Sequence, residues 1–196
     1  MILQFTYDTD GTLDNIRRRL GEFAPKAKQV LARATNDTAK KAKSMLADKA
    51  RATYIVKKGG ITKAMKLKSA TASKPEAIIT VTGRPIELKQ FRVSPASYNP
   101  NNRPKMTRAK ALVAGSMKPL EKNGIKAFIV KYASGHVAVA TRMSGAQYPI
   151  KNLYSVSAPK MIGSERRVYG VLKPAILRLL QENVDRQIRR VLRGFG

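Results

Sequence analysis

Apolar residues recur at steps of three and four residues in two long stretches of the chain, 13–51 and 165–193. This spacing predicts two long amphipathic helices, each with one buried stripe. Gly21 and Pro25 predict a break or kink near the start of the first helix, and Gly194 marks the end of the second. The stripe of the first helix comprises Leu20, Phe23, Ala27, Val30, Leu31, Ala34, Thr38, Ala42, Met45 and Leu46.

Between and before these helices, apolar and polar residues alternate in short runs, which is typical of strands. The strongest pair is a hairpin whose turn is Ala133–His136. Phe91 departs from strict alternation, so its strand is expected to bulge or to end early. Strands are predicted at 2–7, 66–71, 76–82, 85–93, 110–117, 126–132, 137–142 and 150–156.

Three shorter segments complete the pattern. Residues 8–12 are predicted to form a turn that caps the first helix, and 54–65 a helix–turn segment around the pair Gly59-Gly60. Pro159 is expected to open a one-turn helix. The order of elements predicts a single α+β domain over 1–196, with both long helices packed on one face of an antiparallel sheet.

The segment 94–109 is rich in Pro and Asn and carries no core pattern, so a long flexible loop is expected there. At 43% apolar residues, the rest of the chain can form a core. The core must be mostly aliphatic, because Trp is absent and aromatic residues are 6% of the chain.

The net charge of +27 changes the picture most, because it opposes compaction unless an anionic partner is close. Between Lys49 and Lys118 there are sixteen Lys or Arg residues and only two acids, Glu76 and Glu87. The run crosses several predicted elements, which favours a functional surface over an ordinary solvated face. Nucleic acid is the favoured partner, and an acidic protein surface remains the alternative.

Other partners and compartments are excluded or restricted by composition. There is no Cys, hence no disulfide, and a single His cannot form a His cluster for a metal. No apolar run reaches the length of a membrane span, and the first residues lack the pattern of a signal peptide. We therefore expect no membrane partner, and action in the cytoplasm or in an assembly built there.

Candidate chemistry is sparse, and an enzyme is not expected. His136 has no carboxylate near it in sequence, so a turn residue is favoured over a catalytic base. Asp8, Asp10 and Asp14 lack the later Glu of a calcium loop and are interpreted as capping and turn residues. Gly59-Gly60 lacks the Gly-Lys-Ser/Thr ending of a phosphate loop, so a turn is favoured there as well. No cofactor, metal or small-molecule substrate is expected.

The basic stretch suits contact with the phosphates of duplex DNA, which gives binding that is independent of sequence and sensitive to salt. Tyr54, Phe91 and Tyr98 are the only aromatic residues that interleave it, too few for stacking on single strands. The predicted DNA- or partner-facing residues are Lys57, Lys58, Lys63, Lys66, Lys68, Arg103, Lys105 and Arg108.

Two short sequence patterns stand out in the second half of the chain. The first is Ser134-Gly135-His136 followed by Val139 and Arg142. The second is a Pro-Ile…Leu-Tyr segment that runs into a Ser-x-Pro-x-Met turn, at Pro149, Ile150, Leu153, Tyr154, Ser157, Pro159 and Met161. Together with Tyr54…Ile61 and Pro85…Phe91 upstream, these patterns resemble the minor tail protein Z family of long-tailed bacteriophages, and the similarity covers about Leu31 to Leu192.

This resemblance implies a structural virion protein at the head-proximal end of a non-contractile tail, assembled in the host cytoplasm. It implies a homo-hexameric ring around the DNA channel, in contact with tail terminator, tail tube and neck proteins. A role in packing or in a subunit interface is expected for Tyr148, Pro149, Ile150, Leu153, Tyr154, Pro159 and Met161. The alternative is a freestanding, sequence-independent nucleic-acid-binding protein.

Overall fold

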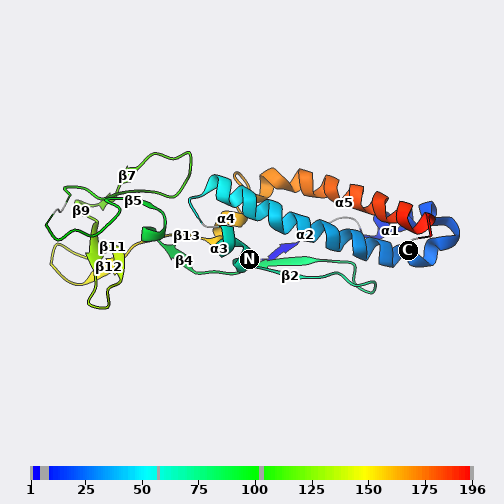
Figure 1. Ribbon diagram of the computed structural model, residues 1–196, viewed down its shortest axis with the longest axis horizontal. Helices are drawn as coiled ribbons and strands as arrows, with labels where there is room; N and C mark the ends of the chain where they lie inside the picture. The colour runs from blue at the N-terminus through cyan, green and yellow to red at the C-terminus, as the bar shows by residue number, and fades with distance from the viewer. Residues whose placement is uncertain (1, 5–8, 57, 102–103, 195–196) are drawn as a thin grey trace.

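The computed structural model describes residues 2–4, 9–56, 58–101 and 104–194. The molecule is elongated (Figure 1). The helices and one small sheet form one end, and a group of short strands forms the other. The predicted α+β class is confirmed, and the strands form several small antiparallel sheets.

The first helical stretch is divided where the sequence predicted a break. Helix α1, Thr9–Leu20, is followed by the 3₁₀ segment η1, Gly21–Lys26, and then by α2, Ala27–Thr53. Gly21 has φ +53°, which favours glycine, and Pro25 lies just before α2. The expected capping turn at 8–12 is wrong from residue 9 onward, because α1 already begins at Thr9.

The C-terminal helix α5, Tyr169–Leu192, lies along α2 (Figure 1). The aliphatic stripes of α2 and α5 meet the inner face of α1, and Ile16, Leu31 and Ile188 are almost fully buried there. The residues between Pro159 and Tyr169 form a short helix, α4 (Ala158–Ile162), and a turn, so α5 begins four residues later than the sequence indicated.

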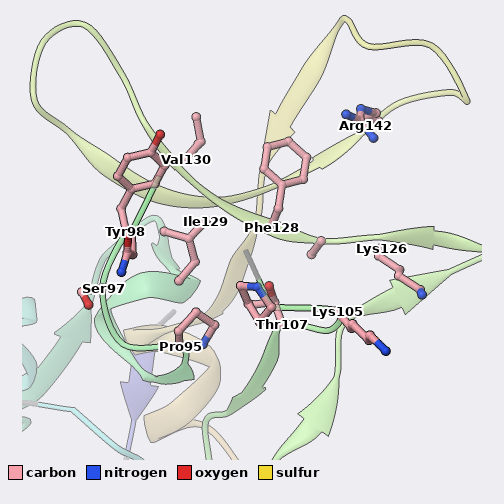
Figure 2. Close-up of a pocket in the computed structure, with 13 residues that line it drawn as sticks. Pro95, Ser97, Tyr98, Lys105, Thr107, Lys126, Phe128, Ile129, Val130 and Arg142 are labelled. Carbon is pink, nitrogen blue, oxygen red and sulfur yellow. The ribbon is translucent and has the colours of Figure 1, made fainter. Parts of the chain in front are cut away.

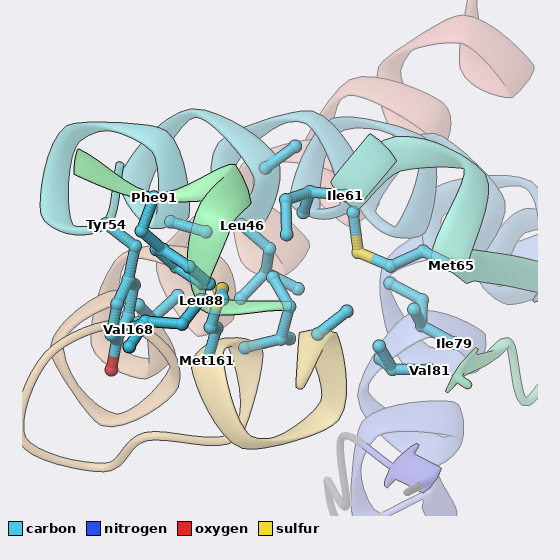
Figure 3. Close-up of a cluster of buried hydrophobic side chains, with 14 of the residues drawn as sticks. Leu46, Tyr54, Ile61, Met65, Ile79, Val81, Leu88, Phe91, Met161 and Val168 are labelled. Atoms are coloured by element: carbon cyan, nitrogen blue, oxygen red, sulfur yellow. The ribbon is translucent and has the colours of Figure 1, made fainter. Parts of the chain in front are cut away.

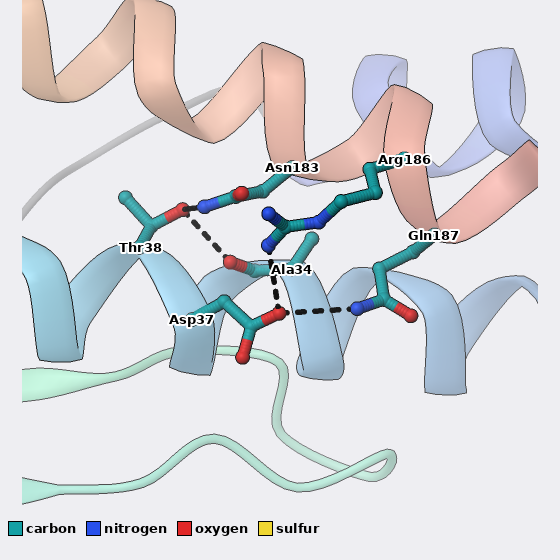
Figure 4. A network of polar contacts seen from close by, with 6 residues as sticks. All are labelled: Ala34, Asp37, Thr38, Asn183, Arg186 and Gln187. Atoms are coloured by element: carbon teal, nitrogen blue, oxygen red, sulfur yellow. Dashed lines mark hydrogen bonds and ion pairs between the residues drawn. The ribbon is translucent and has the colours of Figure 1, made fainter. Parts of the chain in front are cut away.

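A polar cluster lies inside the α2–α5 contact (Figure 4). Asn183 Nδ2 donates to Thr38 Oγ1 at 2.8 Å, and that hydroxyl donates to the carbonyl of Ala34 at 2.8 Å. At the edge of the contact, the Asp37 carboxylate accepts from Arg186 at 3.2 Å and from Gln187 at 3.1 Å. Because each polar group must meet its partner, these contacts fix the position of one helix relative to the other along their axes.

Beside α2 lies a three-stranded sheet in the order β1-β3-β2, formed by Ile2–Gln4, Ile78–Val81 and Met65–Lys68. The side-chain amide of Asn36 on α2 holds this sheet in place. It donates to the carbonyl of Ala70 at 2.9 Å and accepts from the amide of Ala70 at 2.7 Å. The short helix α3, Lys58–Ala64, leads directly into β2, so Gly59-Gly60 lies in a helix and the predicted turn is wrong.

Two strands, β4 (Pro85–Glu87) and β13 (Tyr154–Ser157), pair with each other and connect the helical end to the remaining sheets. We call residues 88–153 the β-lobe. Its strands are β5 Arg92–Ser94, β6 Arg108–Lys110, β7 Lys118–Pro119, β8 Glu121–Lys122, β9 Ile125–Lys126, β10 Phe128–Lys131, β11 Val137–Arg142 and β12 Ile150–Asn152. They form the sheets β5-β6-β7, β8-β9 and β10-β11-β12.

The predicted hairpin is confirmed as β10 and β11, with Phe128 opposite Ala140. The strand predicted at 85–93 is interrupted by a 3₁₀ turn, η2 (Leu88–Gln90), which ends just before Phe91, the residue that departs from alternation. The segment 150–156 is divided between β12, which pairs with β11, and β13, which pairs with β4. The prediction of a strand at 110–117 is wrong, because β6 ends at Lys110 and turns follow.

The largest apolar cluster joins the two ends of the molecule (Figure 3). It takes Leu46 from α2 and Met161 from α4, both fully buried, and meets Leu88 and Phe91 at the base of the β-lobe. Removing such a leucine side chain typically costs about 2–5 kcal/mol of stability. No helix among the described residues is long and apolar enough to cross a membrane.

Candidate functional site

The predicted basic residues fall into two groups that the structure does not bring together (Figure 1). The first group lies on α3 and β2, at the helical end, and comprises Lys63, Lys66 and Lys68. Lys58 begins α3, although its side chain is not described, and Lys57 lies outside the described residues.

The alternation of β2 explains how the first group is presented. Met65 is 2% exposed and Leu67 packs against the core, so the intervening Lys66 and Lys68 project from the opposite face of the strand. Lys63 is exposed on the last turn of α3. No ion pair joins these three ammonium groups to an acid among the described residues.

The second group belongs to the β-lobe. Lys105 precedes β6, Arg108 is its first residue, and both are exposed. Arg103 lies outside the described residues. By sequence, the β-lobe contains twelve Lys or Arg residues and a single acid, Glu121, so its surface potential is strongly positive.

The β-lobe contains an open groove of about 410 Å³, with residues 95–99 and 104–107 on one side and β10 on the other (Figure 2). Lys105, Lys126 and Arg142 contribute its cationic lining, and Tyr98, Phe128 and Ile129 contribute apolar and aromatic surface. The Arg142 guanidinium lies over the Phe128 ring, 5.6 Å from its centroid, in a cation–π contact.

Sequence reasoning did not select Lys126 or Arg142 as a cationic pair. A signal was present in the hairpin itself. Continuing the register that pairs Phe128 with Ala140 by two residues predicts that Lys126 comes near Arg142, although in the structure Lys126 belongs to β9 and pairs with Glu121 of β8. Pairing the two halves of the predicted hairpin residue by residue would therefore have brought both charges to one end of it.

A second hollow, of about 610 Å³, shares Ser97 and Tyr98 with this groove and continues past them to Lys89, Lys131 and Gly135. The Lys89 ammonium donates to the carbonyl of Ala96, which fastens the start of the Pro/Asn-rich segment to η2. The two hollows together follow the outer edge of β10.

The aromatic residues that interleave the basic stretch do not form a stacking platform. Tyr54 and Phe91 are 5% and 6% exposed and belong to the core, which leaves Tyr98 as the accessible one of the three. This arrangement agrees with the argument against single-strand stacking.

His136 lies in the β10–β11 turn, as predicted, where its carbonyl accepts from the amide of Tyr132 at 2.8 Å. The fold also brings it a carboxylate that is distant in sequence, since its Nε2 lies 3.2 Å from Glu87 Oε2 on β4. Its ring stacks on that of Tyr132 at 6.1 Å. No hydroxyl among the described residues hydrogen-bonds to this imidazole, so the contact joins a turn to a strand without forming a nucleophile–base pair.

The residues expected at an interface or in packing divide between those two roles. Met161 is fully buried, and Leu153 packs on the core while its backbone bridges Val139 and Leu88. Tyr148 and Tyr154 are 69% and 53% exposed and are the large apolar surfaces of the set. Pro149 is exposed, whereas Ile150 and Pro159 are half-buried.

The acidic residues that were interpreted as capping and turn residues have different places. Asp10 lies in the first turn of α1, whereas Asp14 lies inside that helix and pairs with Arg17 at 2.9 Å. Asp8 lies outside the described residues. In the parts of the chain that the structure describes, no three acidic or His side chains are grouped to hold a metal ion.

The family model described as prophage minor tail protein Z (GPZ) matches residues 12–194. Comparison with curated proteins and with solved structures gave no match. The matched range includes all of α2, the β-lobe and α5, so both groups of basic residues lie within it.

Proposed function

The chain belongs to the prophage minor tail protein Z family, and from this premise we propose that it completes the head-proximal end of a phage tail and helps to join the tail to the head. In this proposal six copies form a closed ring around the DNA channel. The subunit is a structural component of the virion and performs no catalysis.

The observation that carries this proposal is the family match together with the distribution of charge. The match extends over nearly the whole chain, and the charge of +27 lies on a subunit of 196 residues. Six such subunits repel one another strongly unless an anionic partner fills or surrounds the ring. Duplex DNA in the lumen supplies that counter-charge.

We assign the face of β2 to the DNA. Lys66 and Lys68 project together from one face of the strand, with Lys63 just before them, and none has an acidic partner among the described residues. Such a row of ammonium groups neutralises phosphates without reading bases.

Contacts to the neighbouring proteins are assigned to other surfaces. Tyr148 and Tyr154 offer exposed aromatic area, which is enriched in protein interfaces. Tail terminator, tail tube and neck proteins are the proposed partners outside the ring. Within the ring, each copy is proposed to contact the adjacent copies. The charge of the β-lobe adds a requirement for acidic neighbours.

Cryo-electron microscopy of the head–tail junction in intact particles tests this proposal. We expect a six-fold ring of this chain above the tail tube, with Lys66 and Lys68 facing the density of the lumen. Absence of the chain from the particle would overturn the proposal in favour of a freestanding nucleic-acid-binding protein. A ring whose β2 faces outward would overturn the assignment of the DNA-facing residues alone.

A further inference from the structure

Strand β10 is an edge strand, and its backbone is open to a partner. In the sheet β10-β11-β12 it pairs on one side only, with β11. The bond from the Tyr132 amide to the His136 carbonyl fixes which residues face β11, because hydrogen-bonded pairs alternate along an antiparallel ladder. By this alternation, the N–H and C=O groups of Ile129 and Lys131 point away from β11.

The neighbouring strand confirms this direction. The carbonyl of Val139, which is opposite Ile129, accepts from Leu153 on the far side at 2.8 Å instead of pairing with β10. Among the described residues, the backbone groups of Ile129 and Lys131 have no hydrogen-bond partner on the outer edge. The described residues of the Pro/Asn-rich segment line the other side of the groove, and no backbone hydrogen bond joins them to β10.

The groove beside this edge combines two chemistries. Ile129, Phe128 and Tyr98 give an apolar lining, while Lys105, Lys126 and Arg142 supply positive charge at exposed positions. Among the described residues none of the three cations forms an ion pair, and Glu121 of β8 is the register partner of Lys126. A free strand edge bordered by apolar surface and cations fits an extended chain whose side chains alternate between aliphatic and acidic.

We propose that this groove binds an extended acidic segment of another protein, which adds to the edge of β10 as a further strand. Main-chain hydrogen bonds to Ile129 and Lys131 hold the segment, its aliphatic side chains contact Ile129 and Tyr98, and its carboxylates pair with Lys105, Lys126 and Arg142. A DNA backbone satisfies the cations but has no use for the strand edge or the apolar lining. This proposal rests on the groove and is independent of the ring proposed above.

Binding of a labelled peptide to the full chain tests the proposal. The probe has about eight residues, alternating Glu and Val, which matches an ordinary strand. We expect saturable binding by fluorescence anisotropy, and no binding by the same peptide with Lys in place of Glu. A peptide that is N-methylated at alternate amides is expected to lose at least about tenfold in affinity, because it cannot complete the ladder.

Two matched pairs of variants locate the site. The double variant Lys126→Glu, Arg142→Glu is expected to weaken peptide binding at least about tenfold. The double variant Lys122→Glu, Lys151→Glu makes the same charge change away from the groove. Its affinity for the peptide is expected to stay within about twofold of the wild type. Lys131→Pro removes an outward N–H, and Lys131→Ala keeps it. Only the proline variant is expected to reduce binding strongly.

Three outcomes would overturn the proposal. The first is equal binding of the N-methylated and ordinary peptides, and the second is equal loss in both pairs of charge variants. The third is binding of a duplex DNA of about 20 base pairs that depends on Lys126 and Arg142 and not on the Lys131 backbone, which would make the groove a phosphate site. Circular dichroism of each variant identifies any that has failed to fold. If a charge variant fails to fold, the comparison of Lys131→Ala with Lys131→Pro still distinguishes addition of a strand to β10 from binding of phosphates.

Discussion

Gly170 lies in the first turn of α5 at a point where no side chain fits. A Cβ atom placed on it would be 2.3 Å from the carbonyl oxygen of Glu165 and 2.5 Å from its Oε2. The turn that precedes α5 must shift to admit a methyl group, so Gly170→Ala is expected to lower the free energy of unfolding by about 1–3 kcal/mol. Urea denaturation of the two proteins measures the difference.

Gly60 provides the matched control for this prediction. It also lies in a helix, α3, but a Cβ atom there would have no heavy atom within 4 Å. Gly60→Ala is expected to raise stability by about 0.5–1 kcal/mol, because alanine loses less backbone entropy in a helix. Equal effects of the two substitutions would mean that the close approach at Gly170 is absent.

Tyr169, the neighbour of Gly170, makes stability depend on alkaline pH. Burial, and secondly the Glu165 carboxylate, raise the pKa of Tyr169 above its ordinary value of 10.0. The folded chain therefore retains the phenolic proton at a pH at which the unfolded chain releases it. The resulting contribution to the free energy of unfolding is negative above about pH 10 and absent below it.

Comparison with Tyr169→Phe isolates this effect, because both proteins share the titration of the lysines. We expect the stability of the wild type relative to the phenylalanine variant to fall as the pH rises from about 9 to about 11. Urea denaturation across this range provides the measurement. A difference that stays constant with pH would show that the tyrosine has the same pKa in both states.

At the scale of elements, the contact between α2 and α5 contains a buried hydrogen bond between two polar side chains. Asn183 and Thr38 are 4% and 6% exposed and bond to each other at 2.8 Å. Thr38→Val is expected to cost about 1–3 kcal/mol, because the Asn183 amide is left buried without its partner. Thr38→Val combined with Asn183→Leu removes both polar groups and is expected to cost less than Thr38→Val alone.

A double-mutant cycle by urea denaturation gives the coupling between the two residues, which we expect to be about 1 kcal/mol or more. The exposed pair Asp37–Arg186 serves as the comparison. Its side chains are 38% and 59% exposed, so water screens the attraction and the expected coupling is about 0–1 kcal/mol. Additive costs at Thr38 and Asn183 would rule out the proposed role of this bond in fixing the two helices.

The elements themselves were predictable to different degrees, for physical reasons. The helices and the β10–β11 hairpin follow from local periodicity, and Gly21 and Gly135 take the positive φ values that a break and a turn require. The segment 110–117 is apolar enough for a strand, but beyond Lys110, the last residue of β6, it forms an isolated bridge at Leu112 with Tyr54 in place of a strand. Strand pairing depends on distant segments, so local alternation could not reveal that, among the described residues, this segment has no neighbouring strand to pair with.

At the scale of the whole molecule, the sequence predicted a basic surface but not its division. Lys66 and Arg108 belong to one predominantly basic stretch of the sequence, yet β2 and the β-lobe, which carry them, lie at different ends of an elongated subunit. The groove brings Lys105 beside Lys126 and Arg142 through contacts that no local pattern encodes. Charge alone could therefore indicate an anionic partner without indicating that two separate surfaces were available.

DNA binding by the β2 face is expected to depend strongly on salt concentration, because it releases counterions from phosphates. If Lys63, Lys66 and Lys68 each neutralise one phosphate of duplex DNA, replacing all three by Ser removes three released counterions. The slope of log K against log salt concentration is then expected to become shallower by about 2.7. Fluorescence anisotropy with a duplex of about 20 base pairs, at several salt concentrations, measures this slope.

The control is the triple Ser variant at Lys28, Lys40 and Lys41, which are exposed positions of α2 and carry the same total charge. A general loss of attraction weakens DNA binding in both variants alike, whereas direct phosphate contact changes the slope much more in the β2 variant. Equal slopes in the two variants would overturn the assignment of DNA binding to the β2 face. The proposal of peptide binding in the groove of the β-lobe would be unaffected, because its test involves none of these residues.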